Sequence, residues 1–373
     1  MFTHYYWKNK LYKLSNRDYL CDYSKIKSKK IDMTLSGRYL ASYPNIQIPI
    51  SEFDKYPLLT NIKELEELIK TKTLTKDEII IGSGANGLLQ NIIKILFKSK
   101  GNLITSFYSF DQAEYAVTSF DGLTKRVYTN NYNLDLNNVI KSIDKKTKMI
   151  YICNPNNPTG KFINSKNLIE LSRKIKIPLV VDESGIEFTG KKGILELTKK
   201  LPKNLLILRS FSKAYGLANL RIGYLVCSKE FKEIYLKNIT TNEYSGISCL
   251  IAKNILNSSE KYMKQNINQI IKEKVKMVNR LEEMGIYVVE SYSNTIFTKT
   301  IFDNKFMKKL EKNNISVVPI YDRNNNLHIR IAIQDRDTNS MFIKKLNEIM
   351  KNKELILGKE EDEVIFNENI FSN

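Results

Sequence analysis

Up to about residue 250, short apolar runs alternate along the chain with stretches whose apolar residues recur at helical spacing. Four continuous apolar runs are typical of buried strands, namely "EIIIG" (78–82), "MIYICN" (149–154), "PLVVDE" (178–183) and "NLLILRS" (204–210). The helical spacing is clearest in "NGLLQNIIKILFK" (86–98) and in the segment 164–176. Strands that alternate with helices predict an α/β domain with a mostly parallel sheet.

The pattern changes after about residue 250. One long charged helix is expected over roughly 252–284, with helices between and after the strands that follow it. Those strands are expected near 286–290, 295–300, 315–319 and 327–333. This pattern predicts a second, smaller α+β domain over 246–352 behind a large domain over 46–245, with residues 353–373 as an acidic tail.

Composition narrows the class of protein. The chain has 373 residues, of which 42% are hydrophobic, so it can bury a large core. It contains no apolar run of membrane-spanning length and does not start like a signal peptide, so we expect a cytoplasmic protein without a membrane anchor. The cysteines and histidines are scattered, which predicts neither disulfides nor a metal site; they are Cys21, Cys153, Cys227, Cys249, His4 and His328.

The formal net charge of +19 raises the question of a polyanionic partner. The lysines are spread from end to end, beside many asparagines and isoleucines. A compact basic helix or an aromatic and basic RNA-binding signature is absent from the sequence. We therefore expect no nucleic-acid partner.

The glycine-rich segment "GSGANG" (82–87) follows a predicted strand and precedes a predicted helix. It matches the dinucleotide fingerprint, but that fingerprint requires an acidic residue about twenty positions later. This chain has Ser106 and Phe107 there. The segment is better read as a helix N-terminus whose backbone N–H groups hold a phosphate.

Three further motifs follow apolar strands. "CNPNNPTG" (153–160) is a rigid turn that could present Asn157 as a donor, and "VVDESG" (180–185) ends a strand on Asp182. In "SFSKAYGLANLRIGY" (210–224), Lys213 lies among two serines and Arg221, which suit a phosphate dianion. Because open α/β sheets bind ligands beyond the carboxyl ends of their strands, we expect these motifs to meet.

Together the motifs supply what pyridoxal phosphate requires. Lys213 offers the amine for covalent attachment, Asp182 a carboxylate for the ring nitrogen and Asn157 a donor to the phenolate oxygen. The predicted phosphate cradle consists of Gly84, Ala85, Asn86, Ser210, Ser212 and Arg221.

In this ordered set the chain resembles the fold type I pyridoxal-phosphate enzymes, within the group of histidinol-phosphate aminotransferases and threonine-phosphate decarboxylases. The resemblance covers about residues 50–350. It implies a large domain around a mostly parallel, seven-stranded sheet and a small domain built from both chain ends, so residues 1–45 should form an arm of the small domain and the substrate site.

The resemblance also implies roles for residues outside the motifs. Tyr56 in "KYPLLTNIKEL" is expected to reach the cofactor phosphate of the partner subunit, which implies a homodimer. Tyr108 falls where the family stacks an aromatic ring on the cofactor, and Arg330 in "HIRIAI" where it binds the substrate carboxylate.

Two departures from the family pattern bear on the reaction. Gly185 replaces the tyrosine that aminotransferases usually carry three residues after the cofactor aspartate, and the decarboxylases also lack that tyrosine. Val318 and Pro319 stand where histidinol-phosphate aminotransferases carry a phosphate-binding arginine, so histidinol phosphate itself is not the expected substrate.

The sequence therefore predicts an aminotransferase that acts on a small, phosphorylated amino or keto compound with a donor such as L-glutamate. The principal alternative is a decarboxylase of O-phosphoserine or O-phosphothreonine. Two further alternatives are a nicotinamide dehydrogenase, which would depend on "GSGANG", and a binding protein without a cofactor.

Overall fold

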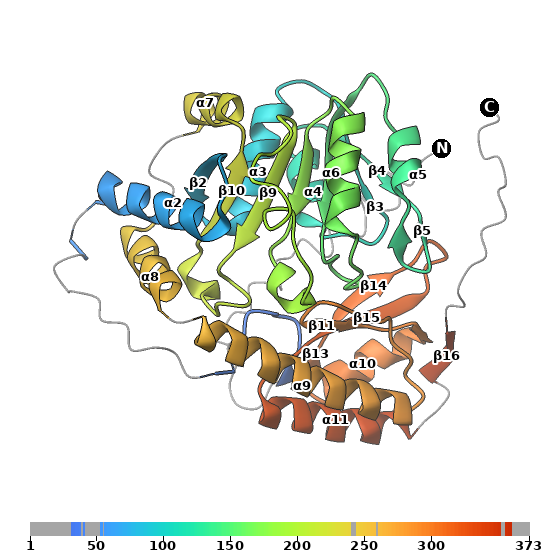
Figure 1. The fold of residues 1–373 in the computed structure, drawn as a ribbon. Helices are drawn as coiled ribbons and strands as arrows, with labels where there is room; N and C mark the ends of the chain where they lie inside the picture. Colours follow the sequence, from blue (N-terminus) through green and yellow to red (C-terminus); the bar gives the residue numbers. More distant parts are fainter. Residues whose placement is uncertain are drawn as a thin grey trace.

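The computed structural model describes residues 31–38, 40–41, 53–54, 56–239, 244–258, 260–351 and 355–359. Cys21 and His4 lie outside these residues, as does most of the expected arm over 1–45. Figure 1 shows a large lobe around a central sheet, with a smaller lobe below it.

The large lobe contains a seven-stranded sheet in which only β10 runs antiparallel to its neighbours. In sheet order, its strands are β2 (Glu78–Gly82), β10 (Gly223–Cys227), β9 (Leu205–Ser210), β8 (Leu179–Asp182), β7 (Thr147–Cys153), β3 (Asn102–Ser106) and β4 (Leu123–Val127). The predicted mostly parallel sheet is confirmed.

Helices cover both faces of this sheet (Figure 1). On one face lie α3 (Gly84–Leu96), α4 (Gln112–Thr118) and α7 (Lys229–Asn238), which share one apolar cluster. On the other lie α2 (Leu59–Thr73), α5 (Leu136–Lys141), α6 (Ser165–Lys174) and α8 (Gly246–Asn257). The short strands β5 (Thr129–Asn130) and β6 (Asn133–Leu134) form a separate hairpin.

The two-sided covering explains why the strands are continuously apolar. In β2, Ile79 and Ile81 pack into the core on the α2 side, whereas Ile80 packs into the core on the α3 side. Because successive side chains of a strand point to opposite faces, a strand buried on both faces shows no polar alternation.

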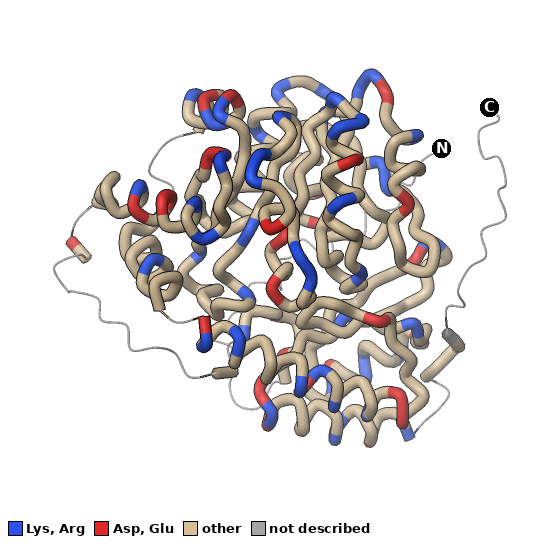
Figure 2. The backbone as a smooth tube through the Cα atoms, viewed as in Figure 1, with Lys and Arg blue, Asp and Glu red and all other residues tan. Residues whose placement is uncertain are grey.

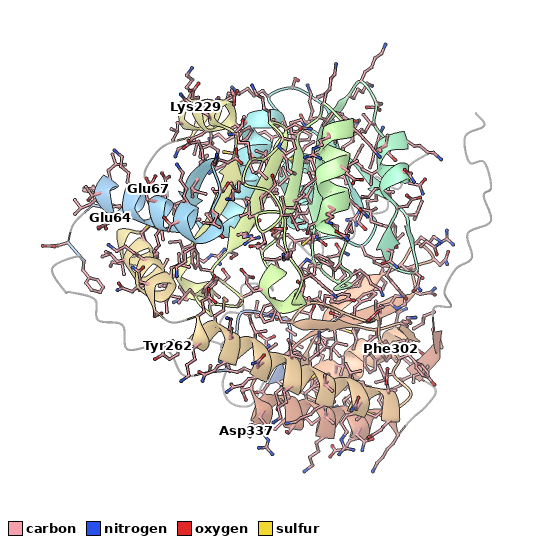
Figure 3. The ribbon with its side chains drawn as sticks, viewed as in Figure 1. Glu64, Glu67, Lys229, Tyr262, Phe302 and Asp337 are labelled. Atoms are coloured by element: carbon pink, nitrogen blue, oxygen red, sulfur yellow. The ribbon has the colours of Figure 1, made fainter. Side chains whose placement is uncertain are left out.

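The small lobe is a four-stranded antiparallel path, β11–β15–β12–β16, with β14 also paired to β15. Its strands are β11 (Thr295–Phe297), β12 (Thr300–Phe302), β14 (Val318–Tyr321), β15 (Leu327–Ala332) and β16 (Ile356–Lys359), and its helices are α9 (Lys261–Glu283), α10 (Asn304–Lys312) and α11 (Arg336–Met350). Phe302, labelled in Figure 3, is 1% exposed and stacks on Phe306 with ring centroids 4.2 Å apart.

A segment from the start of the chain also belongs to this lobe. Strand β1 (Ile31–Asp32) pairs in parallel with β13 (Ile315–Ser316). Met33, which follows β1, is fully buried in the small-lobe core. Residues near the start of the chain therefore lie beside strands some 280 positions later in the sequence.

Three expectations for this region were wrong in detail. The expected single helix over 252–284 is two helices, α8 and α9, because the backbone at Ser258 is extended and its hydroxyl bonds the carbonyl of Ile255. Serine competes with helical hydrogen bonding in this way. Near 286–290 the structure has only one bridge, Val288 to Thr298, and part of the expected tail forms β16.

Positive charge is not gathered on one element. Figure 2 shows lysines and arginines along both lobes, often beside acidic residues. None of the described helices is both long and apolar enough to cross a membrane. Nor does the described part of the chain hold a group of three or more His, Cys, Asp or Glu suited to a metal ion.

Candidate active site

The predicted motifs meet at one edge of the large sheet. Cys153 ends β7, Asp182 ends β8 and Ser210 ends β9, and these strands are parallel neighbours. Cys153 and Asp182 are direct partners in the register. The edge is the carboxyl end of the sheet, where open α/β proteins bind ligands.

The start of α3 and the loop before β10 form a polar recess. Gly84, the first residue of α3, has φ +72, and a Cβ at this position would lie 2.8 Å from Nη2 of Arg221. Both the left-handed backbone and the close approach therefore require glycine at position 84. The guanidinium of Arg221 lies over the N-terminus of α3, a position suited to an anion.

The serines of the fourth motif complete this recess. Nη1 of Arg221 lies 3.5 Å from Oγ of Ser212, whose backbone N–H donates to Oγ of Ser210 at 3.1 Å. The buried Oδ1 of Asn86 has no hydrogen-bond partner in the described part of the chain. The recess therefore combines a guanidinium with two hydroxyls.

Lys213 lies beside Gly185. A Cβ at position 185 would lie 3.8 Å from Nζ of Lys213 and 3.7 Å from Cγ of Pro155. Gly185 has φ −133, which any residue can adopt. A Cβ would therefore be in ordinary van der Waals contact with the lysine side chain, and the backbone does not require glycine at this position.

The carboxylate of Asp182 is 6% exposed and accepts two hydrogen bonds. Tyr151 Oη donates to Oδ2 at 2.8 Å, and the backbone N–H of Ser184 donates to Oδ1 at 2.9 Å. No ion pair joins Asp182 to a cation within the described ranges. Because a buried charge is normally paired, this carboxylate is suited to a cationic ligand group.

Cys153 lies within electrostatic range of both Asp182 and Lys213. Burial raises the pKa of the Cys153 thiol to about 12, the negative charge of Asp182 adds to the rise, and the positive charge of Lys213 opposes it. The thiol is therefore neutral at physiological pH. Its pKa thus reports that Asp182 and Lys213 both lie near this end of β7.

Asn157 and Arg330 are in contact, although they come from different lobes. Nη1 of Arg330 donates to Oδ1 of Asn157 at 3.1 Å, and Nη2 donates to the carbonyl of Thr34. Strand β15, the turn after β7 and the segment after β1 thus converge on one guanidinium. The large and small lobes share this part of the site.

A pocket of about 110 Å³ opens next to Arg330. Its walls include Tyr108, which is 6% exposed, together with Asp111 and Arg126 from the large lobe and residues 318–321 from the small lobe. Burial raises the pKa of the Asp111 carboxyl, while the bond from Gln112 and the charges of Arg126 and Arg330 oppose the rise. The lining of the pocket is mostly apolar or aromatic, with charged side chains contributed by both lobes.

Tyr56, unlike the buried residues of the site, lies at the surface. Its side chain is 88% exposed, and the nearby Phe53, Leu58 and Leu59 are also exposed. Its own chain therefore does not bury it.

Sequence reasoning missed Tyr151, Thr34, Asp111 and Arg126. Tyr151 lies within an apolar run and reads as a core residue, and Thr34 contributes only its backbone oxygen. The positions of Asp111 and Arg126 in a pocket depend on how the lobes pack. No local pattern could have identified these four.

The arrangement fits pyridoxal phosphate. Asp182 is a buried carboxylate without an ion-pair partner, Lys213 offers an amine beside Gly185, and the recess of Gly84 and Arg221 suits a phosphate. A model of the aminotransferase class I and II family matches residues 18–346. The chain belongs to the class I and II aminotransferases.

The relatives of this aminotransferase agree with that assignment. It is 30% identical over 305 residues to a histidinol-phosphate aminotransferase of Caldanaerobacter subterraneus, covering 79% of this chain and 84% of the relative. It is 33% identical over 265 residues to one of Thermoanaerobacter pseudethanolicus, covering 68% and 73%. A crystal structure of a histidinol-phosphate aminotransferase from Sinorhizobium meliloti in complex with pyridoxal-5'-phosphate has a TM-score of 0.76 at 20% identity, covering 82% and 85%.

Enzymes of this family use pyridoxal phosphate to move amino groups, and the residues at the sheet edge fit that cofactor. The chain is therefore a pyridoxal-phosphate-dependent aminotransferase with the fold type I architecture that the sequence predicts. The dehydrogenase alternative and the cofactor-free alternative are wrong.

Proposed function

We propose that the predicted residues hold the cofactor in the roles assigned from the sequence. Lys213 attaches the cofactor and moves the substrate proton, Asp182 pairs with the ring nitrogen, and Asn157 donates to the phenolate oxygen. Tyr108 stacks on the ring. Gly84, Ala85, Asn86, Ser210, Ser212 and Arg221 hold the phosphate. Once bound, the cofactor supplies the electron sink that the chain's own side chains lack.

One observation carries this proposal: in the part of the chain that the structure describes, the Asp182 carboxylate is buried without an ion-pair partner, and the Lys213 amine lies in the loop after the neighbouring strand β9. The two flank the thiol of Cys153, whose pKa responds to both charges. A ligand that binds covalently to an amine and carries a cationic ring nitrogen satisfies both groups.

We further propose that the amino compound is small and phosphorylated, with L-glutamate as the partner donor. Arg330 binds the substrate carboxylate, where one is present, and the pocket next to Arg330 binds the rest of the substrate. The relatives named for histidinol phosphate support a phosphorylated substrate. Val318 and Pro319 line the pocket without offering a charge, which argues against histidinol phosphate itself.

The half-reaction tests this function directly. L-Glutamate added to the cofactor-loaded enzyme should remove the visible absorbance of the lysine-bound cofactor and release 2-oxoglutarate. Borohydride reduction before the addition should fix the cofactor to Lys213, as seen by mass spectrometry. Lys213→Ala should fold but show neither the adduct nor the half-reaction.

The same assay compares the candidate substrates and the alternative reaction. Histidinol phosphate and other phosphorylated amines should be compared as donors, and an absence of exchange with all phosphorylated amines would contradict the substrate proposal. The decarboxylase alternative is tested as well because Gly185, which lies beside Lys213, stands where aminotransferases usually carry a tyrosine and the decarboxylases do not. Carbon dioxide released from O-phosphothreonine, with no 2-oxoglutarate from glutamate, would overturn transamination.

We also propose that the enzyme is a homodimer in which Tyr56 of one subunit reaches the cofactor phosphate of the other. The exposed ring of Tyr56 and the exposed apolar residues Phe53, Leu58 and Leu59 support this proposal. A partner surface would remove this apolar group from water.

A further inference from the structure

Tyr151 is a buried tyrosine whose hydroxyl binds Asp182. It lies on β7, two positions before Cys153, so its side chain is on the same face of the strand as Cys153. Its exposed fraction is 0%, and it is among the largest fully buried side chains of the described chain. The distance from Oη to Oδ2 of Asp182 is 2.8 Å.

The tyrosine hydroxyl is a permanent donor at this position. Burial and the charge of Asp182 raise the pKa of Tyr151 well above its ordinary value. The phenol therefore keeps its proton throughout the physiological range. Because an ionised carboxylate can only accept, the bond runs from Tyr151 to Asp182.

The two donors to Asp182 act on different oxygens. Tyr151 donates to Oδ2 and the backbone of Ser184 donates to Oδ1, so the rotation of the carboxylate is fixed from both sides. Hydrogen bonds donated to a carboxylate favour its charged form. Each oxygen keeps lone-pair capacity for a further donor.

We propose that Tyr151 is a positioning residue, which keeps the Asp182 carboxylate charged and oriented toward the ring nitrogen of the cofactor. This inference rests on the proposed role of Asp182. Tyr151 itself does not touch the reacting atoms, and its effect passes through the carboxylate. In its absence, the buried carboxylate would have one donor instead of two.

Tyr151→Phe removes this one hydroxyl and keeps the ring. A hydrogen bond to a charged group is strong enough that its loss should weaken cofactor binding by about tenfold. The acid-side change in the absorbance of the bound cofactor should move to higher pH by about one unit, since one unit corresponds to about tenfold in proton binding. The acid limb of kcat/KM should move in the same direction.

Tyr235→Phe is the matched control. Tyr235 is 5% exposed, and its hydroxyl accepts a hydrogen bond from Asn91 at 2.8 Å. The control therefore also removes one buried tyrosine hydroxyl from the large-lobe core. It should leave both the cofactor affinity and the pH of the absorbance change at their wild-type values.

A double-mutant cycle tests whether Tyr151 acts through Asp182. If it does, Tyr151→Phe should have almost no further effect on cofactor affinity in the Asp182→Asn background, because the charged acceptor is already gone. If the losses of cofactor affinity caused by the two single substitutions add up in the double variant, the inference is wrong. Should Tyr151→Phe alone fold poorly, the Asp182→Asn and double variants can still be compared with each other.

The outcomes separate this inference from the proposed function. If the wild-type enzyme forms no borohydride adduct at Lys213, the proposed cofactor site is wrong. If the wild type forms it and Tyr151→Phe matches Tyr235→Phe in affinity and in pH dependence, only the role of Tyr151 is wrong.

Discussion

The guanidinium of Arg221 is the charged group of the polar recess, in which we propose that the cofactor phosphate binds. It lies over the start of α3, where a Cβ on Gly84 would come within 2.8 Å of Nη2. Arg221→Ala should therefore weaken cofactor binding by about ten- to a hundredfold, because a charge-assisted contact to phosphate is lost. Position 221 is exposed, so the melting temperature of the cofactor-free protein should change little.

Absorbance titration of the cofactor-free enzyme with pyridoxal phosphate measures this loss. Arg221→Lys is the matched variant, because it keeps the charge but not the planar fork that binds phosphate through two donors. Its affinity for pyridoxal phosphate should lie between that of the wild type and that of Arg221→Ala. Equal affinity in all three would mean that the phosphate lies elsewhere.

At the scale of single residues, the sequence identifies those whose chemical role can be inferred from a local motif. Lys213, Asp182 and Asn157 each follow an apolar strand, so their meeting at the sheet edge could be predicted from chain order alone. Tyr151 could not be distinguished from a core tyrosine, because its function depends on a partner 31 positions away. A residue that acts on the site through another residue can be identified only when the fold is known.

The long helix α9 connects the small lobe to the loop that carries Lys213. Asn266 on α9 is fully buried; its Nδ2 donates to the carbonyl of Ala214 at 2.9 Å, and its Oδ1 accepts from the N–H of Leu40 at 2.7 Å. Asn266→Ala should lower the free energy of unfolding by about 2–3 kcal/mol, because the buried carbonyl of Ala214 and the half-buried N–H of Leu40 lose their partner. The melting temperature should fall by several degrees.

Asn268→Ala serves as the control for helix propensity, since Asn268 lies on the same helix and is exposed. Thermal unfolding by circular dichroism should show the loss for Asn266→Ala only. Cofactor affinity should also fall in that variant, because Ala214 directly follows Lys213. If the melting curves of the Asn266→Ala and Asn268→Ala variants are indistinguishable, Asn266 on α9 does not have this stabilising role.

Strands could be predicted from the sequence where they are buried on both faces. Strand β2 agrees with the apolar run over 78–82, since burial on both faces leaves an uninterrupted signal. The division between α8 and α9 was missed, because a short serine segment does not interrupt the apolar spacing enough to be seen. Strand β16 was missed because its stability comes from pairing with β12, beyond any local pattern.

Tyr56 is exposed on the surface of the single chain. With 88% of its side chain exposed, replacement by phenylalanine should not disturb the fold of a single chain. In the proposed homodimer, however, each cofactor site takes Lys213 from one subunit and Tyr56 from the other. The two residues can therefore be inactivated in different chains, which makes subunit exchange a test of the assembly.

Lys213→Ala chains should be inactive, and Tyr56→Phe chains should bind the cofactor poorly at limiting concentration. When equal amounts are mixed under exchange conditions, about half of the dimers should be hybrids, each with one intact site, so about a quarter of the wild-type sites should recover. Glutamate half-reaction at limiting cofactor measures the recovery, and light scattering should give a dimeric mass. If exchange is demonstrated but activity stays at the level of the unmixed variants, Tyr56 serves its own subunit or none.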